Sequence, residues 1–197
     1  MSYIPNNGTR INSIIGRKIE GIKVEVKRAK EDLTRIYRKS NLNKYELFLI
    51  NNGSEIINRC DQSLRDFKNI NFINLARRSM KKNELCLGRI DEGNLRVMEG
   101  IEIGNLRGLY YNLIEEDVYE YLKRVRRKNP SINLDEVVDK YISISNLTED
   151  SRRYLKILLD IPYDTLRQWR KYRNNKKNLS IEEYLDGISK SFKYEFN

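Results

Sequence analysis

The sequence predicts a mainly α protein with one small β-hairpin near its middle. Apolar residues recur every three or four positions along most of the 197 residues, a spacing that places them on one face of a helix. Only 3 prolines and 10 glycines are present, which is too few for the many turns of a sandwich or barrel. Five of those glycines fall within residues 84–108, where helix is therefore not expected.

Residues 1–8 are expected to form an irregular leader and residues 9–197 a single helical domain. The first helix is expected to begin with Thr9 as its N-cap. Gly16 and Gly21 weaken its first half, each by about 1 kcal/mol relative to alanine. The helix carries one apolar stripe, which predicts packing within its own domain or in a coiled coil: Ile11, Ile15, Ile19, Ile22, Val26, Ala29, Leu33 and Ile36.

A second apolar stripe at helical spacing predicts a helix over residues 45–67. A third, shorter helix is expected over 72–82, ending at Asn83, with Ile73, Ala76 and Met80 facing inward. Residues 84–108 change character: short apolar runs are separated by glycines, and Glu99-Gly100 is a turn signal between two of them. We expect a β-hairpin there that packs on the helices.

Helices follow again over 115–128, 134–142, 148–161 and 164–173. Acidic residues begin the first of these, and Pro130 and Pro162 follow the ends of the first and third. Ser180 and Glu183 have the spacing of a capping box, which opens a last helix.

The composition excludes several classes of site. The chain has no histidine, which removes histidine-ligated metals and serine–histidine or cysteine–histidine catalytic pairs. Its two cysteines are too few for a disulfide framework or an all-cysteine zinc site. We therefore expect no metal and no cofactor. No signal peptide and no run near the roughly 18 apolar residues of a membrane span is present, which predicts a cytoplasmic protein.

The formal net charge is +10. Such an excess is typical of proteins that bind nucleic acid or another anionic surface. The chain is also rich in lysine, isoleucine, asparagine and tyrosine, whose codons are AT-rich, so genome composition could produce part of the same excess.

Two segments resemble a known family. The first is residues 113–129, LIEEDVYEYLKRVRRKN, and the second is residues 146–188, which include KNLSIEEYL at 177–185. They are similar to the spore-coat CotS-like kinases of the aminoglycoside phosphotransferase and choline kinase superfamily. Asp117 matches the aspartate of an Asp-Leu-Ala turn in that family. The resemblance covers about residues 11–197 and implies a kinase C-lobe fold without a counterpart of the N-lobe.

The family's catalytic loop has the order Cys-His-Gly-Asp, with an asparagine five residues after the aspartate. Residues 86–94 here are CLGRIDEGN, so Asn94 matches while Leu87 replaces the histidine and Arg89 the aspartate. The second family motif, Asp-Phe-Asp, falls on residues 105–107. There Asn105 replaces the magnesium-binding acid and Arg107 the second acid. Asp91 and Glu92 remain nearby in sequence as alternative metal ligands.

Phosphoryl transfer depends on positioning and on charge neutralisation by a metal that prefers anionic oxygens. The replaced acids therefore imply a pseudokinase and not an enzyme. By resemblance we expect a sporulation or spore-coat scaffold protein of a low-GC Gram-positive bacterium. We expect this protein to bind a protein partner or to form a homodimer. The contact would use the first helix, the face on which a kinase has its catalytic cleft, or both.

The alternative interpretation is a DNA- or RNA-binding protein. Residues 148–177 have the order of a helix-turn-helix, and basic residues surround Trp169 and Tyr172 in its second half. Solvated helix faces and complements to helix dipoles give the same patterns. The candidate nucleic-acid contacts are Lys123, Arg124, Arg126, Arg127, Arg167, Arg170, Lys171, Arg173, Lys176 and Lys177.

Overall fold

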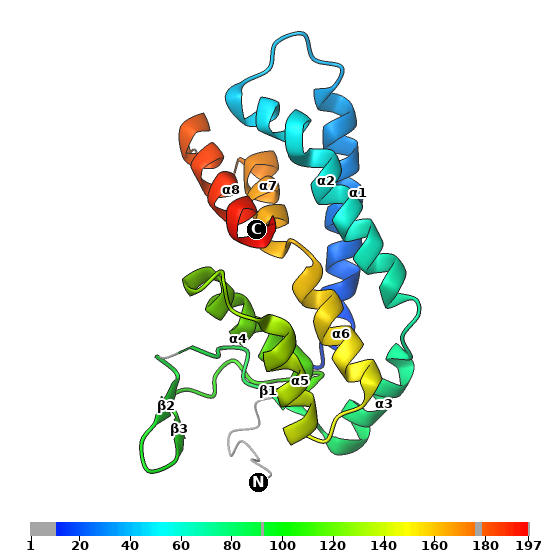
Figure 1. Cartoon of the computed structure of the whole chain (residues 1–197), viewed down its shortest axis with the longest axis vertical. Helices are drawn as coiled ribbons and strands as arrows, with labels where there is room; N and C mark the ends of the chain where they lie inside the picture. Colours follow the sequence, from blue (N-terminus) through cyan, green and yellow to red (C-terminus); the bar gives the residue numbers. More distant parts are fainter. Residues whose placement is uncertain (1–10, 92, 176–178, 197) are drawn as a thin grey trace.

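The computed structural model describes residues 11–91, 93–175 and 179–196, and it confirms the mainly α prediction (Figure 1). The expected leader at 1–8 lies outside these residues. The helices are α1 Arg17–Ile36, α2 Lys44–Phe67, α3 Phe72–Lys82, α4 Ile114–Lys128, α5 Leu134–Ile144, α6 Glu149–Asp160, α7 Tyr163–Asn174 and α8 Ile181–Phe196. The strands are β1 Leu85–Cys86, β2 Leu95–Val97, β3 Ile101–Ile103 and β4 Tyr110–Tyr111.

Helix α1 begins eight residues later than Thr9, so the expected start is wrong. Gly16 adopts a φ of 82° directly before the helix. Upstream of it, Ser13 forms a parallel bridge with Tyr111, and the Tyr111 N–H donates to the carbonyl of Asn12 at 2.9 Å. Strand pairing with a segment almost 100 residues away thus satisfies backbone groups that the local sequence pattern assigned to a helix.

The apolar stripe of α1 from Ile19 to Ile36 lies in the chain's own core, packed on α2 and α7. Fully burying such side chains stabilises the fold by roughly 1.5–3 kcal/mol each. Helix α2 packs tightly at Gly53, where a Cβ would lie 3.0 Å from Leu33 Cδ1 and 3.3 Å from Trp169 Cη2, closer than ordinary van der Waals contact. The stripe from Ile19 to Ile36 is therefore part of the chain's own core.

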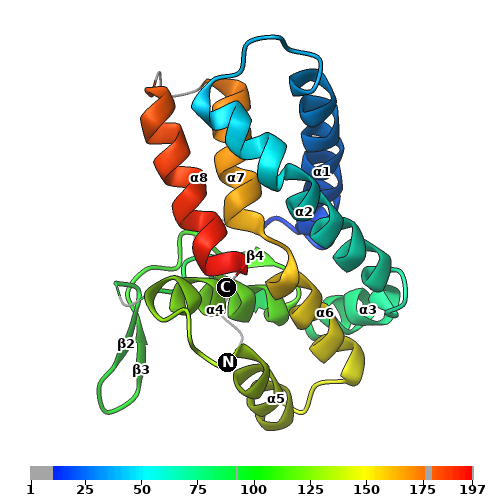
Figure 2. The ribbon, with the colours of Figure 1, turned by 45° about the horizontal axis from the view of Figure 1, so that its top comes forward.

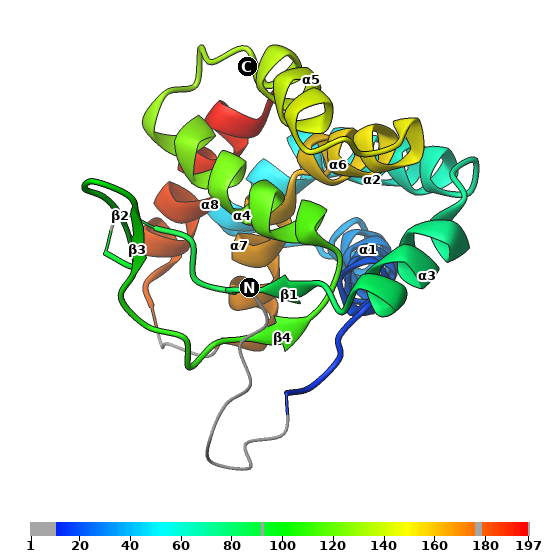
Figure 3. The same ribbon diagram turned by 90° about the horizontal axis from the view of Figure 1, so that it is seen from below.

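The helices form two groups joined by α6. In one group α7 and α8 lie side by side and pack on α1 and α2 (Figure 2). In the other, α4 packs on α6 and β1, while α3 and α5 also contact α6 (Figure 3). Within the described residues, no helix combines the length and apolar composition that crossing a bilayer requires.

The inward face of α3 differs from the predicted one. Leu75 and Ser79 are buried, whereas Ile73 and Met80 are 63% and 64% exposed. The Ser79 hydroxyl donates to the carbonyl of Asn112 at 3.0 Å. Because Ser79 is polar, the hydrophobicity pattern pointed to the neighbouring stripe, but a hydrogen bond across the fold decided which face is buried.

The predicted β-hairpin is confirmed in its strands but not in its packing. β2 and β3 pair antiparallel, with Arg96 opposite Glu102 and Val97 opposite Ile101. A separate two-stranded sheet joins β1 and β4. The β2–β3 hairpin projects from the helices (Figure 1), and Val97 and Ile101 are 85% and 77% exposed.

Candidate functional site

The segment that follows β1 is held by an acid from α4. The carboxylate of Asp117 accepts the backbone N–H of Leu87 at 2.6 Å and that of Gly88 at 3.2 Å. Burial raises the pKa of Asp117, and these two N–H groups oppose that shift. Gly88 has a φ of 68°, and a Cβ there would lie 2.9 Å from the carbonyl oxygen of Gly108. The turn thus requires both a glycine and an acceptor in α4.

Removing that acceptor should open the turn locally. In Asp117→Ala the two N–H groups lose a charged partner, which costs about 1.5–3 kcal/mol per hydrogen bond. We expect hydrogen exchange at Leu87 and Gly88 to accelerate at least tenfold, measured by NMR, while α2 amides change little. Glu136→Gln, at an exposed position of α5, is the control. Equal acceleration at every amide, or none at these two, would contradict this role of Asp117.

Asn94 brings together two positions that the sequence comparison singled out. Its side chain is 2% exposed, and its Nδ2 donates to the carbonyl of Arg89 at 2.8 Å and to that of Asn105 at 3.1 Å. Arg89 and Asn105 are 16 residues apart in sequence but are tied to one amide group. The backbone at these positions is therefore fixed in one arrangement.

The side chains at the family's acidic positions 89, 105 and 107 are cationic or neutral. Asn105 and Arg107 are exposed, and Asn105 Oδ1 accepts the backbone N–H of Arg107 at 2.8 Å. Leu87 is half-buried. Among the described residues, no three histidine, cysteine, aspartate or glutamate side chains gather as a metal site would require. Glu92, the alternative ligand beside Asp91, lies outside the described residues.

Asp91 is engaged by two arginines. Its Oδ2 lies 2.7 Å from Arg124 Nη1 and 3.0 Å from Arg89 Nε, and its Oδ1 accepts the Gly93 N–H at 3.0 Å. Arg124, and then Arg89, lower the pKa of Asp91 to about 2. This carboxylate consequently connects the 89–93 segment to α4.

The depressed pKa of Asp91 gives a pH-dependent prediction. Its ion pairs add stability at neutral pH that is lost as the pH falls from about 4, the ordinary aspartate value, toward 2. Between pH 7 and pH 3.5 the Asp91 carboxyl carbon should therefore show almost no titration shift by NMR. In the Arg89→Gln/Arg124→Gln variant it should titrate in that interval. The same titration in both proteins would show that the arginines do not control this carboxyl.

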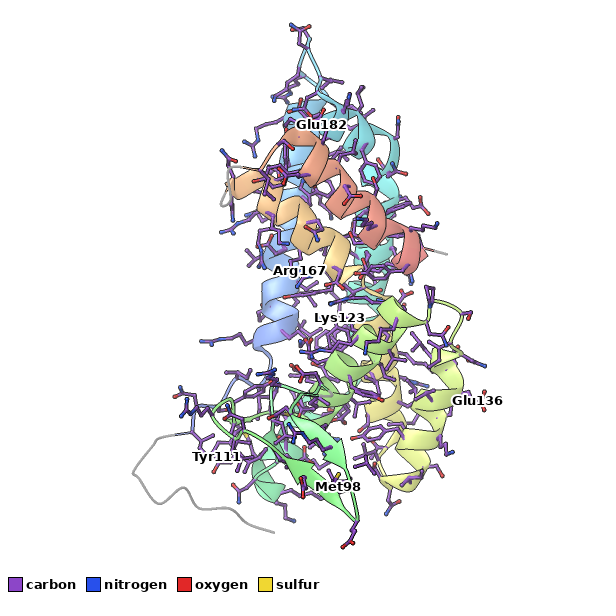
Figure 4. All side chains as sticks on the ribbon, turned by 90° about the vertical axis from the view of Figure 1, so that its left-hand side faces the viewer. Met98, Tyr111, Lys123, Glu136, Arg167 and Glu182 are labelled. Carbon is purple, nitrogen blue, oxygen red and sulfur yellow. The ribbon has the colours of Figure 1, made fainter. Side chains whose placement is uncertain are left out.

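The candidate nucleic-acid contacts on α4 are used inside the fold. Lys123 and Arg126 are 4% and 7% exposed. Lys123 Nζ lies 2.8 Å from Glu120, and burial lowers its pKa, which Glu120 opposes. Arg126 donates to the carbonyl of Leu159 at 2.8 Å. Figure 4 shows Lys123 between the two helix groups, away from the hairpin that carries Met98.

The candidate nucleic-acid contacts on and after α7 are also paired within the fold, or lie outside the described residues. Arg127 of α4 and Arg167 of α7 both contact Asp164, at 2.7 and 3.2 Å. Arg173 pairs with Asp32 and Glu25, and Arg170 lies 3.8 Å from Glu25. Lys171 is half-buried, and Lys176 and Lys177 lie outside the described residues.

Helices α6 and α7 do not form a helix-turn-helix pair. α6 packs on α2 and α4, whereas α7 packs on α1 and α8. Trp169 is 1% exposed, and Tyr172 stacks on Tyr45 with ring centroids 4.0 Å apart, so these aromatic rings belong to the packing of the helices. An exposed recognition helix with stacking aromatics is not present in 148–175.

No sequence pattern indicated the pocket that the structure shows in this region. A pocket of about 360 Å³ lies between Ile90, Asp91 and Gly93 on one side and the outer face of α4 on the other. Ile90, Tyr121 and Val125 contribute its apolar surface, and Arg124 and Lys128 also line it. Its two walls come from segments about 30 residues apart, and only tertiary packing brings them together.

Comparison with known proteins shows similarity in fold only. No protein-family model matches the chain, and no curated protein matches its sequence. Among solved structures, the chain is similar to the crystal structure of an aminoglycoside phosphotransferase from Alicyclobacillus acidocaldarius subsp. acidocaldarius. The TM-score is 0.75 at 12% identity, over 89% of this chain and 54% of that one, so the chain spans about half of that protein's length. With its eight described helices and two small sheets, the chain thus has a mainly α fold of the kinase C-lobe type.

Proposed function

We propose that this chain is a non-catalytic, kinase-like protein that acts by binding another protein. The observation that carries the proposal is the hydrogen bonding of Asn94, which links the backbones of Arg89 and Asn105. The family resemblance expects the catalytic acid and a magnesium-binding acid at these two positions. The structure supports their pairing in space, and the chain supplies an arginine and an amide there.

These side chains are poorly suited to phosphoryl transfer. Magnesium requires hard, usually anionic, oxygen ligands, and Asn105 offers a neutral one. Arg89 adds a cation where a proton acceptor is needed. Asp91, the described carboxylate nearest in sequence to Arg89, directs its oxygens to two guanidinium groups and a backbone N–H. Its depressed pKa also makes it a weak base.

The biological setting that we propose is sporulation or the spore coat. The support is the resemblance of residues 113–129 and 146–188 to spore-coat CotS-like kinases. The phosphotransferase named above shares the fold, and we propose no aminoglycoside substrate for this chain. Mass spectrometry of purified spores and of vegetative cells from the source organism tests the setting, which fails if the protein is absent from the spores.

The proposed loss of catalysis is tested by calorimetry and by metal binding. We expect no magnesium-dependent ATP binding at micromolar concentration and no transfer of phosphate from labelled ATP. The Arg89→Asp/Asn105→Asp variant should gain Mn²⁺ binding, seen as NMR line broadening centred on Asn94, because Asn94 holds the backbones of both positions close together. Micromolar, magnesium-dependent ATP binding by the unmodified chain would overturn the proposal.

A further inference from the structure

The pocket between the 90–93 segment and α4 joins apolar surface to positive charge. Tyr121 is 48% exposed although it is large and partly apolar, and Ile90 and Val125 lie beside it in the pocket lining. A volume of about 360 Å³ is near the lower end of ligand pockets, roughly 300–1,000 Å³, and suits one or two side chains. An exposed apolar hollow of this kind is typical of a binding surface.

Two shared carboxylates leave this surface positive. Asp91 is shared by Arg89 and Arg124, and Asp164 is shared by Arg127 and Arg167. Counted over the described residues, each cluster contains two positive charges and one negative charge, so each keeps a formal excess of one positive charge. Arg124 and Arg127 also line the pocket. The apolar hollow therefore lies between two cationic clusters, which favours a ligand with a few negative charges.

Hydrogen bonds and an ion pair support the pocket wall without a ligand. Asp117 fixes the backbone at Leu87 and Gly88, Asn94 fixes it at Arg89, and Arg124 holds Asp91. A preformed wall lowers the entropy that a ligand must lose on binding.

The apolar surface continues toward the β2–β3 hairpin. Gly93 lines the pocket and β2 begins two residues later, so the hairpin leaves the body at the pocket's edge. Val97 and Ile101 face the same side of the hairpin because they are directly opposite each other, and Met98 at its tip is 70% exposed (Figure 4). The hairpin therefore presents exposed apolar side chains a few residues along the chain from the pocket.

We propose that this surface binds an acidic peptide segment of another protein, with one bulky apolar side chain seated between Ile90, Tyr121 and Val125. An excess of one charge per cluster matches a few carboxylates, whereas a nucleic-acid backbone is held by many phosphate contacts. Tyr121 alone in the lining is aromatic, which is too little for successive stacked bases. The proposal deepens the protein-binding function proposed above by assigning its partner's chemistry.

The test uses the full chain and a ten-residue probe peptide with one central phenylalanine flanked by glutamates. Backbone NMR shifts should be confined to Ile90, Gly93, Tyr121, Val125 and the hairpin, and affinity should fall as salt is raised. A peptide with alanine in place of phenylalanine should bind at least fivefold more weakly, and one with lysines in place of glutamates should not bind.

Variants of the chain localise the binding. Tyr121→Asp should weaken the phenylalanine peptide at least fivefold, and Arg89→Gln about threefold, whereas Tyr37→Asp, at a 56% exposed tyrosine after α1, should change nothing. Any one of four results would overturn the proposal: equal binding of the alanine peptide, NMR shifts elsewhere on the molecule, no binding at millimolar peptide, or tighter binding of a ten-nucleotide oligothymidine at the same amides. No ATP is present in these measurements, so an ATP-binding result bears on the proposed loss of catalysis and the peptide result on the docking surface.

Discussion

Replacing Arg78 with methionine is expected to lower the free energy of unfolding by about 3–5 kcal/mol. The Arg78 guanidinium, on α3, donates to both oxygens of Glu84 at 2.9 and 3.0 Å and to both of Glu115 at 2.8 Å, and also to the Ser151 hydroxyl at 2.8 Å. Glu84 and Glu115 are 8% and 0% exposed, so the substitution leaves two buried carboxylates without their cation. One side chain thus joins α3, α4 and α6.

Urea denaturation at pH 7 measures this loss in the free energy of unfolding, and two further variants provide values for comparison. Arg77→Met changes the exposed neighbour on the same helix and should cost within about 0.5 kcal/mol. Arg78→Lys keeps the charge but cannot present a planar fork to two carboxylates, so its loss should be intermediate. The lysine variant also provides a value if the methionine variant does not fold. Equal midpoints for Arg77→Met and Arg78→Met would refute the central role of Arg78.

Glu195→Ala should destabilise the other helix group by a similar amount, about 3–5 kcal/mol. Helix α7 begins after Pro162 and has no side-chain cap of its own. Glu195 of α8 replaces that cap: its carboxylate accepts the N–H groups of Asp164 and Thr165, each at 2.9 Å, and the Thr165 hydroxyl at 2.7 Å. Burial raises the pKa of Glu195, and these hydrogen bonds oppose the shift.

The matched control is Glu182→Ala, at an exposed position of the same helix (Figure 4), which should cost within about 0.5 kcal/mol. Glu195→Gln keeps one acceptor oxygen and should lose less than the alanine variant. If glutamine and alanine destabilise the protein equally in urea denaturation, the carboxylate does not serve as the cap of α7.

Local sequence determined most helix boundaries. Asn43 and Glu46 form the capping box that opens α2, Asn83 ends α3 in a left-handed conformation, and Ser180 with Glu183 opens α8. The two capping boxes act through hydrogen bonds between residues three apart, so the local sequence specifies them, unlike the cap that Glu195 supplies to α7. The glycines of 84–108 likewise marked the hairpin, because glycine disfavours helix wherever it stands.

Within the candidate site, the sequence identified positions and the fold assigned their partners. Asn94 and Asp117 stood out by resemblance, but only the structure shows that one amide holds positions 89 and 105 and that Asp117 holds the turn at Gly88. Basic residues near Trp169 suggested a nucleic-acid surface because the carboxylate partners of Arg170 and Arg173 lie far away in sequence. Arg173 and its partner Asp32 are 141 residues apart.

The sequence by itself therefore determined what depends on near neighbours: helix periodicity, caps, turns and the absence of histidine chemistry. The tertiary structure alone decided the extended pairing of residues 12–14 with Tyr111, the buried face of α3, the ion pairs between distant segments and the pocket beside Tyr121. The physical reason is distance along the chain. A charge or backbone group is satisfied by whatever the fold brings within about 3 Å, and a linear pattern contains no record of that partner.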